Sequence, residues 1–231
     1  MRQNIYDYDY ELRRARSKRI MTVTVTSVLV ILLLTLFFNL VMFPVLVKSD
    51  SMSTELERNS VVFVMPLDRN PSRGDIILVD RRDGLELSWW QNTIDAVVGF
   101  FSLQQYRPFA HSPNVTGNSC LRRVLALPGD SVYMKDYILY VKPAGQTHFL
   151  TEFELARTPY QLSLSAPRSG TDVLAPVGSF DEITLSSDQY FVLADNRMSG
   201  TDSRVWGPMI EKGIRGRAVL EAFPFNKFSS L

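Results

Sequence analysis

The longest apolar stretch of the chain lies near its N-terminus, where residues 20–47 carry no charged side chain. An α-helix needs about 20 apolar residues to cross a bilayer, so this stretch is long enough for one span. Basic flanks stay on the cytoplasmic side of a membrane. One basic residue, Lys48, follows closely, whereas five precede the stretch: Arg13, Arg14, Arg16, Lys18 and Arg19. The pattern predicts a cytoplasmic basic segment over 1–19, a single transmembrane helix over 20–47 in the cell membrane, and an extracytoplasmic body over 48–231.

The body is patterned as short strands separated by turns. Its apolar runs are rich in β-branched residues, and turn residues such as Pro71 and Gly74, or Pro128 and Gly129, stand between them. Short strands with frequent turns and few helices predict a mainly β fold. The expected strands cover residues 60–65, 75–80, 121–127, 132–134, 137–141, 183–185, 190–193 and 217–223, with a Lys135-Asp136 turn closing a hairpin.

Two segments, 81–118 and 143–180, interrupt the strand pattern and are interpreted as insertions. Residues 87–101 within the first carry apolar side chains at helical spacing. The helix has two interpretations, either packing on the core or lying on a bilayer surface. The residues concerned are Trp90, Ile94, Val97 and Phe101, with Trp89 beside them.

Composition narrows the possible partners and cofactors. The chain carries 25 Lys and Arg against 24 Asp and Glu, a formal net charge of +1, whereas proteins that bind nucleic acid usually carry a basic excess. We therefore expect no nucleic-acid partner. A single cysteine, Cys120, excludes an internal disulfide and a thiolate cluster, and we expect neither a metal site nor a cofactor.

The candidate chemistry begins with Ser51 and Met52, just past the predicted span. A serine there either satisfies backbone groups where a helix ends or acts as a nucleophile at the membrane surface. A nucleophile also needs a base and an oxyanion site, so the rest of the chain decides.

Three stretches in order carry a resemblance to a known family. The first is S-D-S-M over 49–52, the second is R-R-V-L-A-L-P-G-D over 122–130, and the third is A-D-N-R over 194–197 followed by D-S-R-V-W-G over 202–207. Together they resemble bacterial signal peptidase I, the membrane-anchored serine endopeptidase that removes signal peptides from secreted preproteins. The resemblance implies a signal-peptidase-I-like β body on one N-terminal helix, with preprotein signal peptides and the lipid bilayer as partners.

The resemblance also implies roles for individual residues. In the family, the serine matching Ser51 attacks the scissile carbonyl, and its N–H together with the hydroxyl matching Ser49 forms the oxyanion site. A neutral lysine accepts the proton of the nucleophile, a further serine hydrogen-bonds to that lysine, and the substrate lies extended along strands. The remaining matched residues are structural: Met52, Arg123, Pro128, Gly129, Asp130, Asp195, Asn196, Arg197, Asp202, Ser203 and Arg204, of which Asp202 and Arg204 are expected to form an ion pair.

The sequence departs from the family at the base. Arg122 occupies the position of the lysine, and Gly200 occupies that of the serine that supports it. Arginine has a pKa above about 12 and supplies no neutral amine. Of the possible substitutes, Lys48 lies at the end of the predicted span, where a lysine more often reaches the lipid headgroups and stays charged. His111 and His148 fall in regions that the family does not use for catalysis.

Two hypotheses of different class follow. In the first, the protein is a serine endopeptidase for secreted preproteins, with Ser51 as nucleophile and an unidentified base. In the second, it is a non-catalytic relative that binds signal peptides or partners an active peptidase in the same membrane. Family membership favours the first, and the missing lysine favours the second.

Overall fold

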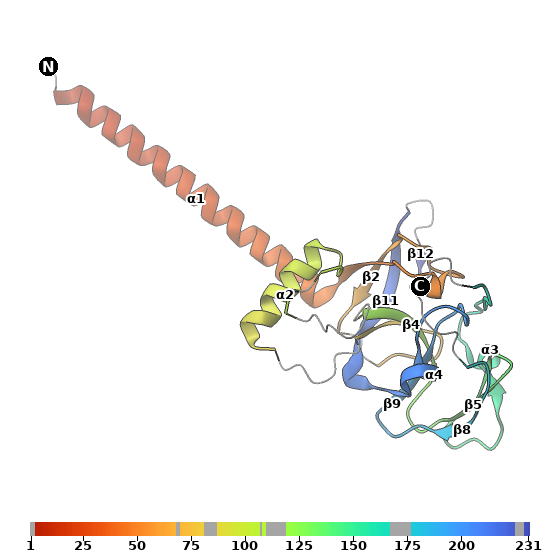
Figure 1. Cartoon of the computed structure of the whole chain (residues 1–231). Helices are drawn as coiled ribbons and strands as arrows, with labels where there is room; N and C mark the ends of the chain where they lie inside the picture. Colours follow the sequence, from red (N-terminus) through yellow and green to blue (C-terminus); the bar gives the residue numbers. More distant parts are fainter. Residues whose placement is uncertain are drawn as a thin grey trace. The chain divides into compact units, whose positions relative to one another are not determined.

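The computed structural model of the chain consists of two compact units, Met1–Asn39 and Leu40–Leu231 (Figure 1). Its description covers residues 3–67, 70–80, 87–106, 108–109, 119–166, 177–224 and 229–231, without the side chains of 3–9, 11–12, 34–35, 37–40, 119 and 229–230.

Helix α1 (Gln3–Val41) contains the basic segment and most of the apolar stretch. Eleven of its apolar side chains are exposed, at positions 20, 21, 23, 25, 28–33 and 36. Among the described residues, no helix is both long enough and apolar enough to cross a membrane. The transmembrane helix predicted over 20–47 is therefore not confirmed.

The predicted C-terminal limit of that helix is wrong. The helix ends at Val41, and Phe43–Leu46 form strand β1, which pairs antiparallel with β2. Pro44 explains the change, because it has no N–H for a helical hydrogen bond and disfavours the α conformation at Phe43. The last apolar residues of the stretch thus belong to the body.

The body is mainly β, as predicted, and consists of two antiparallel sheets (Figure 1). The larger sheet is curled and has the order β1 (Phe43–Leu46), β2 (Val61–Met65), β11 (Ile214–Phe223), β3 (Ile76–Asp80), β4 (Ser119–Ala126), β9 (Gln189–Leu193) and β10 (Met209–Ile210), with β12 (Ser229–Ser230) paired to β11. The smaller sheet has the order β7 (Leu150–Thr151), β6 (Ile138–Lys142), β5 (Ser131–Lys135) and β8 (Phe180–Thr184).

The predicted hairpin exists, with its turn shifted by one residue. Lys135 pairs with Ile138, so the two turn residues are Asp136 and Tyr137 rather than Lys135 and Asp136. Both have positive φ, 50° and 65°, as a tight two-residue turn between twisted strands requires.

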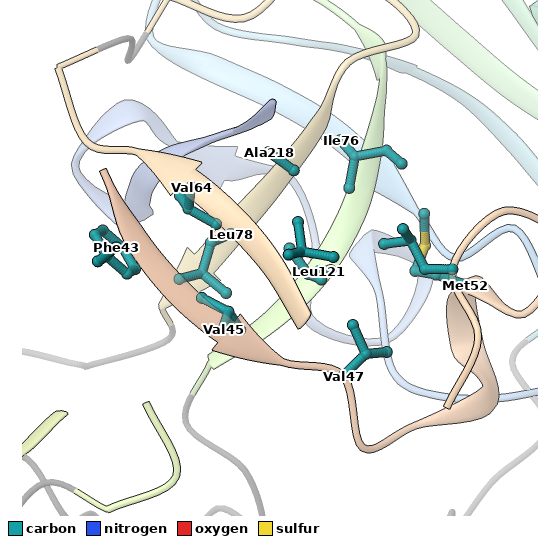
Figure 2. Close-up of a cluster of buried hydrophobic side chains, with 11 residues drawn as sticks. Phe43, Val45, Val47, Met52, Val64, Ile76, Leu78, Leu121 and Ala218 are labelled. Carbon is teal, nitrogen blue, oxygen red and sulfur yellow. The ribbon is translucent and has the colours of Figure 1, made fainter. Parts of the chain in front are cut away.

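Two apolar clusters position the site. The first fills the curl of the larger sheet, where side chains from β1, β2, β3 and β4 meet Met52 and Leu56 (Figure 2). The second joins the two sheets through Leu125 and Phe191 of the larger sheet and Val132 and Leu139 of the smaller one. The three sequence motifs therefore lie on or next to strands with buried faces: the first in a 3-10 helix after β1, the second on β4 and the third directly after β9.

Helix α2 (Trp89–Phe101) confirms the helix predicted over 87–101. Five of its apolar side chains are exposed, whereas the acidic Asp95 is buried and accepts a hydrogen bond from the Phe109 N–H at 2.9 Å. A helix packed on the core has the opposite arrangement, so that interpretation fails for the exposed side chains Trp89, Trp90, Ile94, Val97 and Phe101. The rest of the first insertion, 81–86, 107 and 110–118, lies outside the described residues.

Candidate active site

Ser51 lies in a short 3-10 helix, η1 (Asp50–Met52), which follows β1 directly. Its neighbour Met52 is inserted into the apolar cluster, and Ser51 itself is fully buried. The Ser51 carbonyl accepts a hydrogen bond from the Asn196 N–H at 2.9 Å, which ties the first motif to the third. The 3-10 helix is thus fixed by the packing of Met52 and by the hydrogen bond from Asn196.

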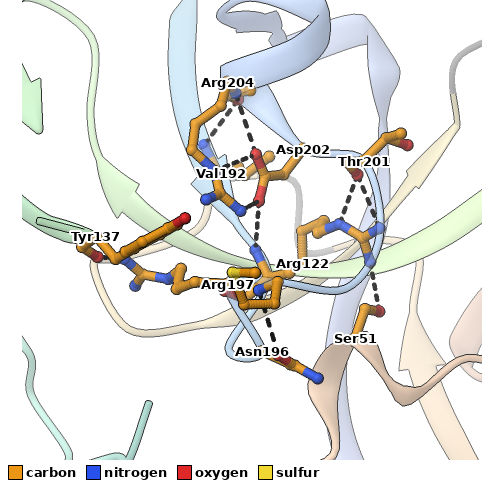
Figure 3. Close-up of polar contacts among 12 residues, drawn as sticks. Ser51, Arg122, Tyr137, Val192, Asn196, Arg197, Thr201, Asp202 and Arg204 are labelled. Atoms are coloured by element: carbon orange, nitrogen blue, oxygen red, sulfur yellow. Dashed lines mark hydrogen bonds and ion pairs between the residues drawn. The ribbon is translucent and has the colours of Figure 1, made fainter. Parts of the chain in front are cut away.

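The structure brings Ser49, Ser51 and Arg122 together, as the resemblance implied. The Oγ atoms of Ser49 and Ser51 are 2.8 Å apart, and Arg122 Nη1 donates a hydrogen bond to Ser51 Oγ at 2.9 Å (Figure 3). Among the described residues, these two are the side-chain partners of the Ser51 hydroxyl. Arg122 has no lone pair to accept a proton, so it donates to Ser51 and cannot deprotonate it.

Arg122 extends from β4 and is only 3% exposed. Its Nε and Nη2 atoms donate to the Thr201 carbonyl at 2.9 and 2.8 Å, and Nη1 also donates to the Leu121 carbonyl. All its described partners are neutral oxygens. The site therefore contains a buried positive charge beside Ser51 with no described carboxylate to balance it.

Gly200 explains why the arginine fits. A Cβ at this position would lie 2.9 Å from Arg122 Nη2 and 3.0 Å from the Ser51 Cβ, and the Gly200 φ of +85° is one that side chains rarely adopt. A serine at position 200 therefore collides with the guanidinium. The two departures from the family, Arg122 and Gly200, are therefore sterically linked, because the arginine occupies the space that a side chain at position 200 would need.

Among the described residues, none of the candidate replacement bases contacts the Ser51 hydroxyl. Lys48 and His148 are exposed, and His111 lies outside the described residues. Asp195 and Asp202 are buried nearby, and each is held by an arginine, Asp195 by Arg123 and Asp202 by Arg204. In the part of the chain that the structure describes, no carboxylate or imidazole contacts the Ser51 hydroxyl.

Arg123, beside Arg122 on β4, is a structural residue that connects four segments. It donates to both carboxylate oxygens of Asp195 at 2.8 and 2.6 Å, to the Gly74 carbonyl at 2.7 Å and to Glu55, and it stacks on the Tyr160 ring at 4.4 Å. Burial alone would lower the pKa of Arg123, but the hydrogen bond and charge of Asp195, with the charge of Glu55, raise it. The guanidinium stays charged and fixes the third motif against the second.

Two further motif arginines form buried ion pairs. Arg204 contacts Asp202 at 2.7 Å, which confirms the predicted pair, and Asp202 also accepts the Ala194 N–H at 3.1 Å. Arg197 donates to both oxygens of Glu152 and to the Tyr137 carbonyl, the latter at 2.7 Å. Among the other motif residues, Asp130 binds Arg73 at 2.7 Å, Gly129 has a φ of +83°, and the Ser203 hydroxyl accepts the Val192 N–H at 3.0 Å.

Three residues that hold the site together were not predicted from the sequence. Glu152 and Tyr160 come from the segment interpreted as an insertion, and burial with the negative charge of Glu152 raises the pKa of the Tyr160 phenol. Thr201 contributes its backbone carbonyl, which no sequence pattern reveals. The T-E-F-E run over 151–154 is typical of a helix N-terminus and marks α3 (Glu152–Leu155), but it does not predict that Glu152 points inward.

The described residues contain no group of three or more His, Cys, Asp or Glu that could hold a metal ion. The arrangement of Ser51, Ser49 and Arg122 offers hydroxyls and one cation. Chemically, it can hold a carbonyl or an anion by hydrogen bonds.

Comparison with known proteins agrees with the motifs. The sequence model of the family described as signal peptidase, peptidase S26, matches residues 19–223. A probable signal peptidase I-1 from Synechocystis is 27% identical over 193 residues, covering 81% of this chain and 74% of the relative.

Signal peptidase I from Bacillus amyloliquefaciens is 31% identical over 108 residues, which is 46% of this chain and 52% of the relative. The match thus spans about half the length of that relative. Among solved structures, a signal peptidase I from Enterococcus faecalis is 20% identical and covers 65% of this chain and 97% of its own, with a TM-score of 0.31.

Proposed function

The chain belongs to the signal peptidase family, peptidase S26, and from that membership we propose that it binds signal peptides of preproteins without cleaving them at a useful rate. The observation that carries the proposal is the hydrogen bond from Arg122 to Ser51, at the position where the family places its proton acceptor. The described side-chain partners of the Ser51 hydroxyl are this cation and the neutral Ser49 hydroxyl, and neither is a base that can take its proton.

The peptide-binding half of the proposal is supported by strand β1. It ends the strand order of the larger sheet, so among the described residues one of its edges has no partner strand. An extended peptide can add to such an edge through main-chain hydrogen bonds. Val45, Val47 and Leu121 are buried in the adjacent apolar cluster, which fixes the backbone beside this edge.

A second candidate function is the serine endopeptidase itself, with Ser51 as nucleophile. The contact between the Ser49 and Ser51 hydroxyls favours it, because it keeps a donor next to the reacting atom. The charge of Arg122 would stabilise an oxyanion at the same place. This candidate needs a proton acceptor outside the described contacts.

The two candidates are separated by comparing the full chain with Ser51→Ala in detergent. We expect a fluorescently labelled preprotein to bind both proteins equally, to exceed binding of the same protein without its signal peptide, and to be cleaved by neither. Robust cleavage by the wild type that disappears in Ser51→Ala would establish the endopeptidase instead. Equal weak binding with and without the signal peptide would overturn the binding proposal.

We also propose that the exposed face of α2 binds a lipid bilayer. The face presents two tryptophans and three further apolar side chains, and the single charged residue of the helix, Asp95, points inward. Tryptophan side chains with an apolar body and a polar tip favour the membrane–water interface. The apolar side chains exposed on α1 support the same partner, which gives the protein a membrane location.

A further inference from the structure

The turn that leaves α2 contacts the strand on which a bound peptide is expected to pair. We propose that this turn, residues 102–106, is a built-in cap on the open edge of β1 and competes there with an extended peptide. The cap rests on the proposed peptide-binding function and regulates that function. The cap is defined by its contacts with Leu46, five residues before Ser51.

The direction of the backbone groups shows which edge is capped. The Val47 N–H donates to Ser60, and the Val47 carbonyl accepts from Asn59, so Val47 is bonded toward β2. Adjacent residues of a strand direct their backbone groups to opposite sides, so Leu46 faces the open edge. Leu46 is therefore the backbone donor and acceptor that an added strand would use.

The cap satisfies both backbone groups of Leu46. The Leu46 N–H donates to the Leu103 carbonyl at 3.2 Å, and the Leu46 carbonyl accepts from Gln105 Nε2 at 3.2 Å. Phe100, at the end of α2, packs against the apolar cluster and holds the turn beside β1. A peptide can pair with Leu46 only after these two hydrogen bonds open.

The backbone of the cap is strained, which lowers the free energy needed to open it. Leu103 and Gln104 both have positive φ, 53° and 63°, a region that residues with side chains seldom occupy. Glycine adopts this conformation without a steric penalty, and a β-branched residue adopts it least readily. Substitution at Gln104 can therefore shift the cap in either direction.

Three variants of the full chain in detergent test the cap. Gln104→Gly relieves the strain, with the loss of the long contact from Arg215 Nη1 to Gln104 Oε1 at 3.5 Å, and is expected to strengthen the cap. Gln105→Ala removes the side-chain donor and is expected to weaken the cap. Gln146→Ala is the matched control, because Gln146 is exposed in a turn of the smaller sheet. The measurements are hydrogen exchange at the Leu46 amide without ligand, and the affinity of a synthetic signal peptide by fluorescence anisotropy.

We expect Gln105→Ala to speed exchange at Leu46 and to bind the peptide about two- to tenfold more tightly, the ratio that one neutral hydrogen bond supplies. Gln104→Gly should slow exchange and weaken binding, and Gln146→Ala should match the wild type. Changed exchange with unchanged peptide affinity would show that the turn does not compete with the peptide, and unchanged exchange in both variants would show that it is no cap. If no variant binds the peptide, the proposed function fails, and the competition fails with it.

Discussion

Restoring the family's residues at positions 122 and 200 gives the sharpest test of the site. A lysine at 122 is shorter than arginine and ends near the present Cζ atom, which lies 3.7 Å from a Cβ placed on residue 200. A serine hydroxyl there is one bond further along and reaches such an amine. Arg122→Lys combined with Gly200→Ser therefore rebuilds a base and its partner, and also removes the 2.9 Å overlap with Nη2.

The two single changes are each expected to fail for a different reason. Gly200→Ser alone meets the guanidinium and keeps a φ of +85°, a backbone cost of about 1–3 kcal/mol. Arg122→Lys alone leaves the amine without its hydroxyl partner and free to stay charged. Since general-base catalysis contributes about 10²–10⁴-fold in rate, the double variant should gain part of that range.

The assay is cleavage of a preprotein by the wild type, both single variants and the double variant, each with and without Ser51→Ala. Contacting residues couple by about 0.5–3 kcal/mol, so the double variant should exceed the product of the single effects by roughly 2- to 150-fold. Thermal unfolding of each variant separates lost folding from lost chemistry. An additive result, with all four proteins cleaving equally slowly and folding equally well, would refute the reasoning that the arginine and the glycine form one unit.

Three further outcomes are expected. Arg197→Met leaves the buried Glu152 carboxylate without its ion-pair partner and should lower the free energy of unfolding in urea by about 3–5 kcal/mol. Lys142→Met breaks an exposed ion pair and should change that free energy by less than about 1 kcal/mol. Equal losses in the two variants would contradict the structural role of the buried pair. Gly216→Ala places a Cβ 2.3 Å from a backbone oxygen of β2 and should destabilise the protein by more than about 1 kcal/mol. An unchanged melting temperature would contradict this expectation. In nanodiscs of brominated lipid, the tryptophan fluorescence of the wild type should be quenched, and quenching should be lost when Trp89 and Trp90 are both changed to Phe. Equal quenching in both proteins would show that α2 does not lie on the membrane surface.

Much of the fold could be predicted because local pattern determines it. The predicted strands fall on observed strands, since β-branched apolar runs bounded by turn residues have few other structures. The limit of the first helix was missed because apolar composition is the same in a helix and in β1, and only Pro44 distinguishes them. The resemblance to signal peptidase I implied that Ser49, Ser51 and Arg122 lie together.

The rest depends on contacts between distant segments. The Thr201 carbonyl binds Arg122 through its backbone, which leaves no trace in residue type. Glu152 pairs with Arg197 across 45 positions, and the cap on Leu46 comes from a turn more than 50 residues away. Such pairings follow from tertiary geometry, so a pattern of neighbouring residues does not contain them.

The arginine connector at position 123 has a consequence for how this family can change. Its contacts with Asp195, Glu55, Gly74 and Tyr160 hold the loops of the site in place, and none of them involves the Ser51 hydroxyl. The framework is therefore independent of the reaction. A change at position 122 can therefore leave the loops of the site in place, because Arg123 and not Arg122 connects them.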